Sequence, residues 1–335
     1  LIRRALYGGK VAGRDFWHHL QDCMGHLGFF SSRADPDVWL RLSKRSTGEE
    51  YYEYVLLYVD DVLVISESAE KVLRNEIGQH FVLRDESIGP PLQYLGGKLR
   101  LVTLNNGVKA WAFGSCQYVQ SAVKNVDEHL AKIGEKLPYK APTPLSSGYR
   151  PEIDVSPELG EADASYFHSL IGVLHWIVEL GRVDLDVEVS MMSSHLALPR
   201  EGHEKIYHIF AYLKAHSNTK MVFNPTPPVI DMNLFERQDW SFSPYGCDGL
   251  TEELPSNMPK SLGPSMMLRV YVDSDHAGDL VTRRSRTGFV VFLNGAPIYW
   301  SSKKQTSCET STFGSEFVAM KQATEYIRGL RYKTT

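Results

Sequence analysis

Apolar residues recur at steps of three and four along several stretches of the chain, which is the spacing of one buried helix face. The first stretch, residues 14–29, carries Phe16, Trp17, Leu20, Met24 and Leu27 in this spacing. The pattern returns in residues 68–81 and runs through most of residues 165–223. We therefore predict two helices in the first third of the chain and a helical middle part.

A different pattern surrounds a pair of adjacent aspartates. Residues 53–59 and 62–66 are apolar runs rich in β-branched and aromatic side chains, and they are joined by Asp60 and Asp61. Such runs favour strands, and a two-residue connection favours a hairpin, here with both carboxylates at its tip. Residues 91–102 predict a further short strand or hairpin.

The end of the chain changes to a mixed pattern. Residues 268–272 read as a strand, and residues 287–302 read as two strands that turn at Asn294 and Gly295. Residues 315–332 return to helical spacing. The predicted order is strand, strand, strand, helix.

Two segments rich in Pro, Gly, Ser and Thr separate these blocks and read as linkers. They are residues 138–164 and residues 224–265, and the second holds seven of the 17 prolines. A segment of this length is unusual as a loop inside one compact domain. We therefore predict three structured parts, 1–137, 165–223 and 266–335.

Composition places the chain among globular proteins, because 43% of its 335 residues are hydrophobic and 23% are charged. No apolar run approaches the roughly 20 residues of a membrane span, and the start does not resemble a secretion signal. The four cysteines lack the close pairing of a zinc ribbon or a disulfide framework, and they are Cys23, Cys116, Cys247 and Cys308. This usage favours a reducing, intracellular setting.

Charge is distributed unevenly along the chain. The formal net charge is -4, yet residues 268–335 contain ten Lys and Arg against six Asp and Glu, and so carry +4. Five of these basic residues flank the predicted hairpin at 287–302, namely Arg283, Arg284, Arg286, Lys303 and Lys304. Such residues are commonly solvated surface, but beside an acidic site they would suit backbone phosphates.

The adjacent Asp60 and Asp61 have two interpretations. Aspartate is common in turns, and this is the more frequent meaning of the pattern. The alternative is a magnesium site for phosphoryl transfer, in which carboxylates from more than one element meet. This alternative requires a third carboxylate from another part of the chain.

A second group of acids follows the strand at 268–272. Asp273, Asp275 and Asp279 lie in an Asp-rich segment that by itself is typical of a loop. Glu316, however, opens the final helix, and a helix packed across a sheet can bring such a residue to the end of a strand. Two acids from separate elements around a divalent cation suit the cutting or joining of phosphodiesters.

A set of motifs in one order points to a family. LYGGKVAGRDFW resembles the family's LYGLKQAPRAW, YVDD is its reverse-transcriptase metal motif, and YLGGKL resembles its FLG turn. CQYVQSAV, YFHSLIGVLHWIVELGRVDL, VDSDHAGD, RTGFVVFLNGAPIYWSSKKQ and SEFVAM resemble its later segments. The chain thus resembles the polyprotein of copia-type LTR retrotransposons, from the middle of reverse transcriptase to the start of RNase H.

The resemblance implies an α+β fold in three parts. Residues 1–137 would form a partial reverse-transcriptase palm and thumb, and residues 165–223 a helical connection region. Residues 266–335 would form the first half of an RNase H-like α/β domain with a mixed sheet. Residues 138–164 and 224–265 remain linkers in this scheme.

The resemblance also implies roles for individual residues. Asp60 and Asp61 would hold Mg²⁺, for which Mn²⁺ is a possible substitute, and Asp273 and Glu316 would be metal ligands of RNase H, with Asp275 and Asp279 as weaker candidates. Residues implied in binding template, nucleotide or primer are Gly8, Lys10, Tyr58, Leu95, Gly96 and Gly97. The five basic residues near the last hairpin would contact phosphates.

Partners and location follow from the family alone. The resemblance implies an RNA template, a DNA primer, an RNA–DNA hybrid and other parts of the polyprotein such as integrase. It implies cytoplasmic particles and the nucleus, without a membrane. The oligomeric state is left open.

The sequence also departs from the family. The third palm carboxylate of the family lies upstream of LYGLK, and its RNase H continues past the first helix, so we expect a fragment with little or no catalysis by itself. One alternative is a non-catalytic relic that binds nucleic acid, with strong salt dependence and insensitivity to Asp60→Asn. Another is a metal-dependent nuclease that uses Asp273 and Glu316.

Overall fold

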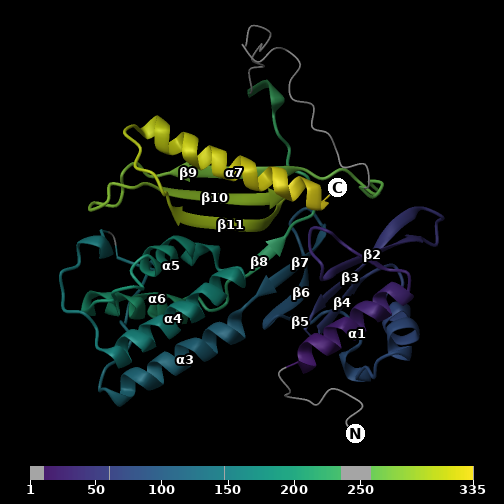
Figure 1. The fold of residues 1–335 in the computed structure, drawn as a ribbon, viewed down its shortest axis with the longest axis horizontal. Helices are drawn as coiled ribbons and strands as arrows, with labels where there is room; N and C mark the ends of the chain where they lie inside the picture. The colour runs from purple at the N-terminus through teal and green to yellow at the C-terminus, as the bar shows by residue number, and fades with distance from the viewer. Residues whose placement is uncertain (1–10, 60, 147, 235–257, 335) are drawn as a thin grey trace. The chain divides into compact units, whose positions relative to one another are not determined.

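The structure, a computed structural model, describes residues 11–59, 61–146, 148–234 and 258–334 (Figure 1). Its contacts divide the chain into two compact units. The first comprises residues 11–91 with the short stretches 258–265 and 331–334, and the second comprises residues 92–234 and 266–330. Each unit is described by itself.

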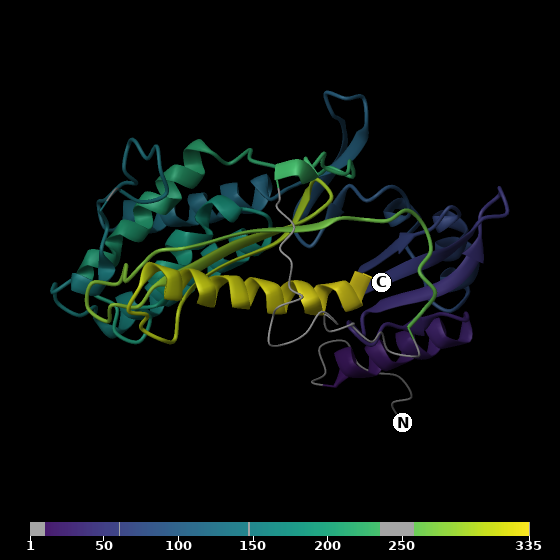
Figure 2. The ribbon, with the colours of Figure 1, turned by 90° about the horizontal axis from the view of Figure 1, so that it is seen from above.

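The first unit is built on an antiparallel sheet in the order β1-β2-β3-β4. The strands are β1 (Phe30–Ser31), β2 (Val38–Lys44), β3 (Glu50–Tyr58) and β4 (Asp61–Ile65). Helix α1 (Ala12–His26) lies along one face of this sheet, as Figures 1 and 2 show. Its buried residues Leu20, Cys23 and Met24 share a core cluster with Trp39, Val55 and Leu57 of the sheet, so the predicted amphipathic helix is confirmed.

The second predicted helix is also present, although it is irregular. It consists of α2 (Ala69–Lys71), the π-helical turn η1 (Val72–Glu76) and the 3₁₀ turn η2 (Ile77–Gln79). A separate 3₁₀ turn, η3 (Asp85–Ser87), follows it. Val72 and Ile77 are buried in the same core as α1, so tertiary packing holds a helical run whose own hydrogen bonding is irregular.

An arginine ties three elements of this unit together. The guanidinium of Arg41 on β2 donates to the Glu53 carboxylate at 2.6 and 3.0 Å, to Glu76 at 2.8 Å and to the carbonyl of Leu27 at 2.8 Å. It also lies over the ring of Phe29, with 4.2 Å to the centroid. Glu53 is only 4% exposed, so this charge is compensated by partners rather than by water.

The second unit contains another antiparallel sheet, in the order β5-β6-β7-β8. Its strands are β5 (Gln93–Tyr94), β6 (Gly97–Thr103), β7 (Lys109–Gly114) and β8 (Met221–Phe223). Strand β8 pairs with β7, with Phe223 opposite Trp111. The middle part of the chain is therefore not helical throughout, because its last three residues complete this sheet.

Helices form the largest core of the second unit. They are α3 (Cys116–Lys132), α4 (Glu161–Glu179), α5 (Asp186–Ser193) and α6 (Ile206–Ala215), with the turns η4 (Pro151–Ile153), η5 (Val183–Leu185), η6 (Glu201–Lys205) and η7 (Met232–Leu234). Val126, Leu174 and Phe210, from three different helices, are each at most 1% exposed in one cluster. Helix α3 joins this core although we did not predict it as a helix.

The predicted strand, strand, strand, helix order of the last part is confirmed. Strands β9 (Leu268–Ser274), β10 (Arg286–Leu293) and β11 (Ala296–Lys304) form an antiparallel sheet, which α7 (Thr312–Thr334) crosses (Figure 1). Leu293 pairs with Ala296, so Asn294 and Gly295 form the predicted two-residue turn. Ala323 of α7 packs with Phe289 and Val291 of β10.

The arrangement confirms the broad prediction of an α+β protein, because its sheets are antiparallel and its helices pack beside them. The predicted division into five segments stays a prediction. No helix within the described ranges is both long enough and apolar enough to cross a membrane.

Candidate functional site

The β3–β4 hairpin presents the predicted polymerase residues at its tip. Tyr58 pairs with Asp61, and Val59, which follows Tyr58, has a φ of 55°. Tyr58 is 46% exposed and Asp61 is exposed as well. Asp60 lies outside the described residues, as do Gly8 and Lys10. The confirmed hairpin therefore brings Asp61 to the surface of the first unit.

The predicted primer-binding residues form a second tight turn, between β5 and β6. Tyr94 pairs with Gly97, and the two residues between them, Leu95 and Gly96, have φ values of 49° and 79°. Two successive positive φ values are the geometry of a hairpin turn whose twist matches its strands. Gly97 follows directly, and a Cβ atom built there would lie 2.1 Å from the ring of Phe113. A side chain at Gly97 would thus displace the Phe113 ring.

Gly97→Ala is expected to lower the free energy of unfolding of this sheet by about 1–3 kcal/mol, because the added methyl group forces the Phe113 ring to move. Gly25→Ala on α1 is the comparison, since nothing lies within 4 Å of its built Cβ atom. Urea unfolding followed by circular dichroism measures both variants. Equal stability of the two would contradict the packing argument.

Asp273 and Glu316 lie on different elements of the last part. Leu268, Val270 and Val272 of β9 pack under α7, and strand side chains alternate between faces, so the Asp273 side chain belongs to the opposite face. It lines a cavity there with residues of η5 and α5. Glu316 lies on α7 and is exposed. The pairing of these two acids at a metal ion stays a prediction.

Asp275 and Asp279 organise the loop between β9 and β10. The Asp275 carboxylate accepts from the backbone N–H of Arg286, and a Cβ atom at Gly278 would clash with that carboxylate. Asp279 accepts from the N–H groups of Val281 and Thr282, at 3.1 and 2.6 Å. Asp275 and Asp279 therefore both have the role expected of aspartates in a loop, because their carboxylates accept hydrogen bonds from nearby backbone N–H groups.

Asp279 also forms an ion pair that bears on the predicted basic face. The Lys304 ammonium lies 2.5 Å from its carboxylate. Burial alone would raise the pKa of Asp279, but hydrogen bonds from Lys304 and Thr282 outweigh it and hold that pKa well below its usual range. The Lys304 ammonium is thus bound to Asp279 within the chain.

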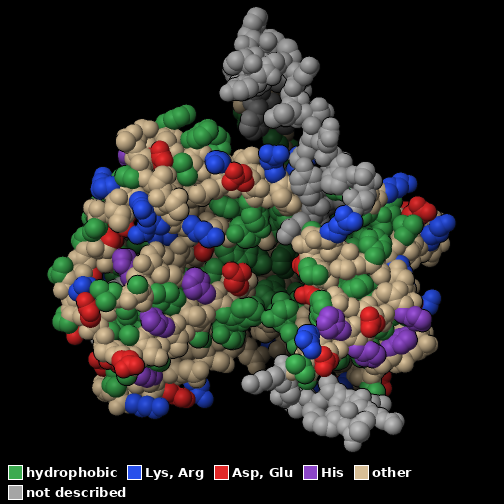
Figure 3. Space-filling view, in the orientation of Figure 1, with side chains coloured by type: hydrophobic (Ala, Val, Ile, Leu, Met, Phe, Trp, Pro, Cys, Tyr) green, Lys and Arg blue, Asp and Glu red, His purple; other side chains and the backbone are tan. Residues whose placement is uncertain are grey.

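The other basic candidates divide in the same way. The Arg286 guanidinium donates to Ser190 Oγ at 2.6 Å, and burial lowers its pKa despite nearby acids. Arg283, Arg284 and Lys303 are exposed. In the space-filling view, Lys and Arg side chains lie over α7 and its neighbouring strands, with Asp and Glu among them (Figure 3). Three of the five candidates are therefore available to a partner.

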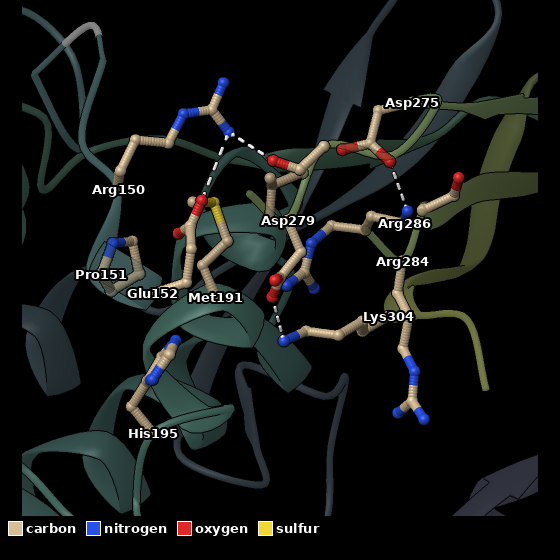
Figure 4. A pocket seen from close by; sticks show the side chains of 13 residues that line it. Arg150, Pro151, Glu152, Met191, His195, Asp275, Asp279, Arg284, Arg286 and Lys304 are labelled. Atoms are coloured by element: carbon tan, nitrogen blue, oxygen red, sulfur yellow. Dashed lines mark hydrogen bonds and ion pairs between the residues drawn. The ribbon is translucent and has the colours of Figure 1, made fainter. Parts of the chain in front are cut away.

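A charged pocket connects the β9–β10 loop with the segment before η4 (Figure 4). The Arg150 guanidinium donates to the carbonyl of Gly278 at 3.0 Å, and the N–H of Leu280 donates to Glu152 at 3.3 Å. Arg286, Lys304 and Asp279 line the same pocket. These contacts attach part of the predicted 138–164 linker to the last sheet.

An acid that the sequence did not single out lies near Asp273. Asp186 opens α5 and lines the same cavity of about 270 Å³. Burial raises the pKa of Asp186 to about 6, and Glu179 adds to this, whereas Arg286, Lys303 and the Ser302 amide act in the opposite direction. No sequence motif indicated Asp186, because its position beside the sheet depends on helix packing.

Within the residues that the structure describes, no group of three or more His, Cys, Asp or Glu side chains is arranged to hold a metal ion. This finding does not include Asp60, which is outside them.

The chain was compared with known proteins. No protein-family model and no solved structure matches it. It is 23% identical over 325 residues to the retrovirus-related Pol polyprotein from transposon TNT 1-94 of Nicotiana tabacum, which covers 95% of this chain. It is also 23% identical over 320 residues, 94% of this chain, to the corresponding polyprotein from transposon RE1 of Arabidopsis thaliana. The chain is related to retrotransposon Pol polyproteins.

The similarity covers nearly all of this chain but only a small part of the two polyproteins. The chain spans 20% of the length of the tobacco polyprotein and 18% of the Arabidopsis one. The putative transposon Ty5-1 protein of Saccharomyces cerevisiae is 23% identical over 302 residues, which cover 89% of this chain and 80% of that protein. The predicted retrotransposon resemblance is thus confirmed, and it applies to a polyprotein segment.

One retrotransposon-like motif has a structural role in this chain. In GRVDL, the buried Arg182 is 1% exposed and donates to the Asp184 carboxylate at 2.7 and 2.9 Å. It also donates to the carbonyl of His216, just after α6, at 3.0 Å. Tyr212 donates to Asp184 at 3.0 Å. The motif therefore connects η5 to the end of α6.

Proposed function

We propose that this chain is the part of a retrotransposon Pol polyprotein that contributes to RNA-directed DNA synthesis and to removal of the RNA strand by RNase H. The observation that carries the proposal is the β3–β4 hairpin, which holds Tyr58, Val59 and Asp61 of the YVDD motif at an exposed tip. The relationship to transposon polyproteins over 95% of the chain supports it.

In the polymerase part, Asp60 and Asp61 are the residues that would hold Mg²⁺, with Mn²⁺ as a substitute. The ion supplies charge stabilisation to the reacting phosphates and activates the attacking hydroxyl. Tyr58 and the turn at Leu95–Gly97 contact the primer and template, and Gly8 and Lys10 contribute to the nucleotide pocket. The proposed ligands are an RNA template and a DNA primer.

The RNase H assignment rests on residues 266–335, whose three antiparallel strands and following helix occur in the predicted order. Asp273 and Glu316 stay the proposed metal ligands of this part, and they would supply oxygen ligands to a divalent ion. An RNA–DNA hybrid remains the proposed ligand of this part, with Arg283, Arg284 and Lys303 at its phosphates.

Assembly with other parts of a polyprotein is part of the proposal. Two-metal phosphoryl transfer needs several acids at close quarters, usually from separate elements. We expect little or no synthesis by the chain alone and synthesis when another polyprotein part supplies the further acid. Other polyprotein parts, such as integrase, are proposed partners, and cytoplasmic particles and the nucleus are the proposed locations.

A second candidate function is binding of nucleic acid without catalysis. The exposure of Arg283, Arg284 and Lys303 favours it, because these three are not committed to the internal contacts that hold Arg286 and Lys304. Binding of this kind depends on phosphate neutralisation and weakens steeply as salt is added.

Primer extension on an RNA template tests the proposal, with the chain and its Asp60→Asn variant compared in Mg²⁺ and in Mn²⁺. We expect no extension by the chain alone, and extension that Asp60→Asn abolishes when the rest of a related polyprotein is supplied. Extension that Asp60→Asn leaves intact would overturn the polymerase role. Hybrid binding that weakens with salt, without extension in any mixture, would favour the second candidate.

A further inference from the structure

Strand β9 is an open edge of the last sheet. The strand order is β11-β10-β9, so β9 has a partner strand on one side only among the described residues (Figure 1). Its seven residues contain no proline, and their register with β10 is continuous from Leu268 to Ser274. Charge, proline or a bulge commonly keeps such an edge from pairing with another chain. The edge of β9 has neither proline nor bulge, so its charges decide what it can pair with.

The hydrogen bonds to β10 determine which backbone groups of β9 face outward. The N–H of Asp275 donates to the carbonyl of Arg286 at 3.2 Å, just beyond one end of the paired strands. At the other end, the N–H of Asn294 donates to the carbonyl of Met267 at 2.7 Å. Hydrogen-bonded pairs alternate along an antiparallel ladder, so the odd-numbered residues of β9 bond to β10. The even-numbered residues therefore point their N–H and C=O groups outward. They are Leu268, Val270, Val272 and Ser274.

The side chains of β9 are arranged symmetrically about Tyr271. Val270 and Val272, one residue to either side, pack under α7. Arg269 and Asp273, two residues to either side, lie on the opposite face together with Tyr271, because strand side chains alternate. Tyr271 is 59% exposed, and Asp273 is exposed as well. The apolar residues are thus mirrored about Tyr271, whereas the charged residues are mirrored with opposite sign.

These two charges have no ion-pair partner among the described residues. The Arg269 guanidinium donates to the hydroxyl of Tyr271 at 3.1 Å and to the carbonyl of Asn294 at 3.0 Å. Its Nε atom is buried without a hydrogen-bond partner. Residues four apart along a strand are separated by about 13 Å, so Arg269 cannot reach Asp273 of its own copy. A second strand that runs in the opposite direction would place an acid beside Arg269.

We propose that two copies of this chain associate through β9, with the two strands antiparallel and the two-fold axis at Tyr271. This register places Val270 opposite the partner's Val272, so that outward N–H and C=O groups bond to one another. It also places Arg269 opposite the partner's Asp273, and the symmetry repeats this ion pair. Both ion pairs fall at non-hydrogen-bonded positions, where facing side chains are closest.

The charges select this register over its neighbours. An axis at Val270 would place Arg269 opposite the partner's Tyr271, and an axis at Val272 would place Asp273 there. The axis at Tyr271 pairs both charged residues and overlaps the whole strand. A different partner would need an acid and a base at the same spacing on an extended segment, and a second copy of β9 has them.

The inference goes beyond the proposed function, because association of two copies requires neither catalysis nor nucleic acid. Pairing of two short strands is at the small end of specific interfaces, so we expect a dissociation constant of roughly 10–100 μM. Sedimentation equilibrium of the full chain measures it. The samples contain EDTA and no nucleic acid, so that no metal ion occupies the Asp273 carboxylate.

Charge reversal is the first test of the pairing. Asp273→Arg places like charges opposite each other at both symmetric positions and is expected to weaken association at least tenfold. Arg269→Asp should have the same effect. The combined variant restores opposite charges, and we expect its affinity to return to within about threefold of the parent chain. Circular dichroism of each variant reports whether it folds.

Arg100→Asp is the matched control for charge. Arg100 is an exposed arginine on β6, and it makes the same change of charge away from the proposed interface. We expect its association to equal that of the parent chain.

Tyr271→Cys tests the register directly. A non-hydrogen-bonded pair holds its two Cα atoms about 4.5 Å apart, which is within the range that a disulfide spans. Oxidation with diamide should therefore yield a linked dimer in excess of the background that the parent chain's own cysteines give. Arg100→Cys is expected to stay at that background.

Weaker association in both charge variants, recovery in the combined variant and linkage through residue 271 support the edge-to-edge dimer. A parent chain that stays monomeric, or association that neither charge variant changes, overturns it. Failure of the combined variant to recover, when all three variants fold, also overturns it. If Arg269→Asp does not fold, Asp273→Arg and Tyr271→Cys decide the question. Primer extension is scored separately, so the dimer stands or fails independently of the proposed function.

Discussion

Arg41→Met lowers the free energy of unfolding of the first unit by about 3–5 kcal/mol, the cost of leaving a buried charge without its partner. The expected loss is large because Glu53 is 4% exposed and receives two bonds from Arg41. Glu76 and the Leu27 carbonyl lose their donor at the same time. Hydrogen exchange of the β2 and β3 amides measures the effect in this unit.

The same cluster predicts a pH dependence with a definite sign. Burial would raise the pKa of Glu53, but hydrogen bonds from Ser66 and Arg41 outweigh it, and the pKa is lowered. A lowered folded pKa gives stability that is complete above the unfolded value of about 4.3 and is lost as the pH falls through the folded value. Arg41→Met should weaken this dependence, because Arg41 contributes both a hydrogen bond and charge attraction to the lowered pKa of Glu53.

The matched control for Arg41→Met is Arg45→Met, a change at the residue that directly follows β2. Arg45 pairs with Glu49 at 3.4 Å, and both side chains are exposed, at 49% and 63%. Exposed pairs of this kind contribute about 0–1 kcal/mol. Equal losses in the two variants would refute the role assigned to the buried cluster.

Arg182→Leu is expected to destabilise the helical core of the second unit by about 1–3 kcal/mol, since it removes the hydrogen bonds that a buried arginine makes to a carboxylate and to a carbonyl. The Asp184 carboxylate loses two bonds, and the carbonyl of His216 after α6 loses its donor. Burial raises the pKa of Asp184, but the bonds from Arg182 outweigh it and lower the net value. Hydrogen exchange of α4 and α6 amides is the measurement.

A second substitution distinguishes charge from geometry at this place. Arg182→Lys keeps the charge but cannot make two parallel bonds to Asp184 and a third to His216. We expect it to recover less than half of the loss. Asp184→Asn combined with Arg182→Leu should cost less than the sum of the two single changes, because the residues share one interaction. Strict additivity would contradict the coupling.

Local pattern was sufficient for much of the fold. The β3–β4 hairpin and the β10–β11 turn at Asn294 follow from short apolar runs and two-residue connections, which act over neighbouring residues. Helix α1 follows from its apolar spacing. Helix α3 was not predicted. Strand β8 was not predicted either, because it is a three-residue segment that pairs with β7, about 110 residues earlier in the chain.

The candidate sites show the same division. The sequence pointed to Asp61 at a hairpin tip, and the structure has it there. The sequence also pointed to five basic residues and did not distinguish among them. In the structure, Arg286 and Lys304 bind internal partners. The hydrogen bond of Arg286 to Ser190 and the ion pair of Lys304 with Asp279 join residues that are distant in the sequence, so no local pattern indicates them.

The sequence by itself determined the order of motifs, the relationship to retrotransposon polyproteins, and the local strands and helices around each candidate acid. Only the tertiary structure decided which residues surround Asp273. Its alternation with Val272 sets its face, but α7 covers one face and α5 borders the other through contacts between distant segments. Long-range packing therefore brought Asp186 of α5 to the cavity that Asp273 lines.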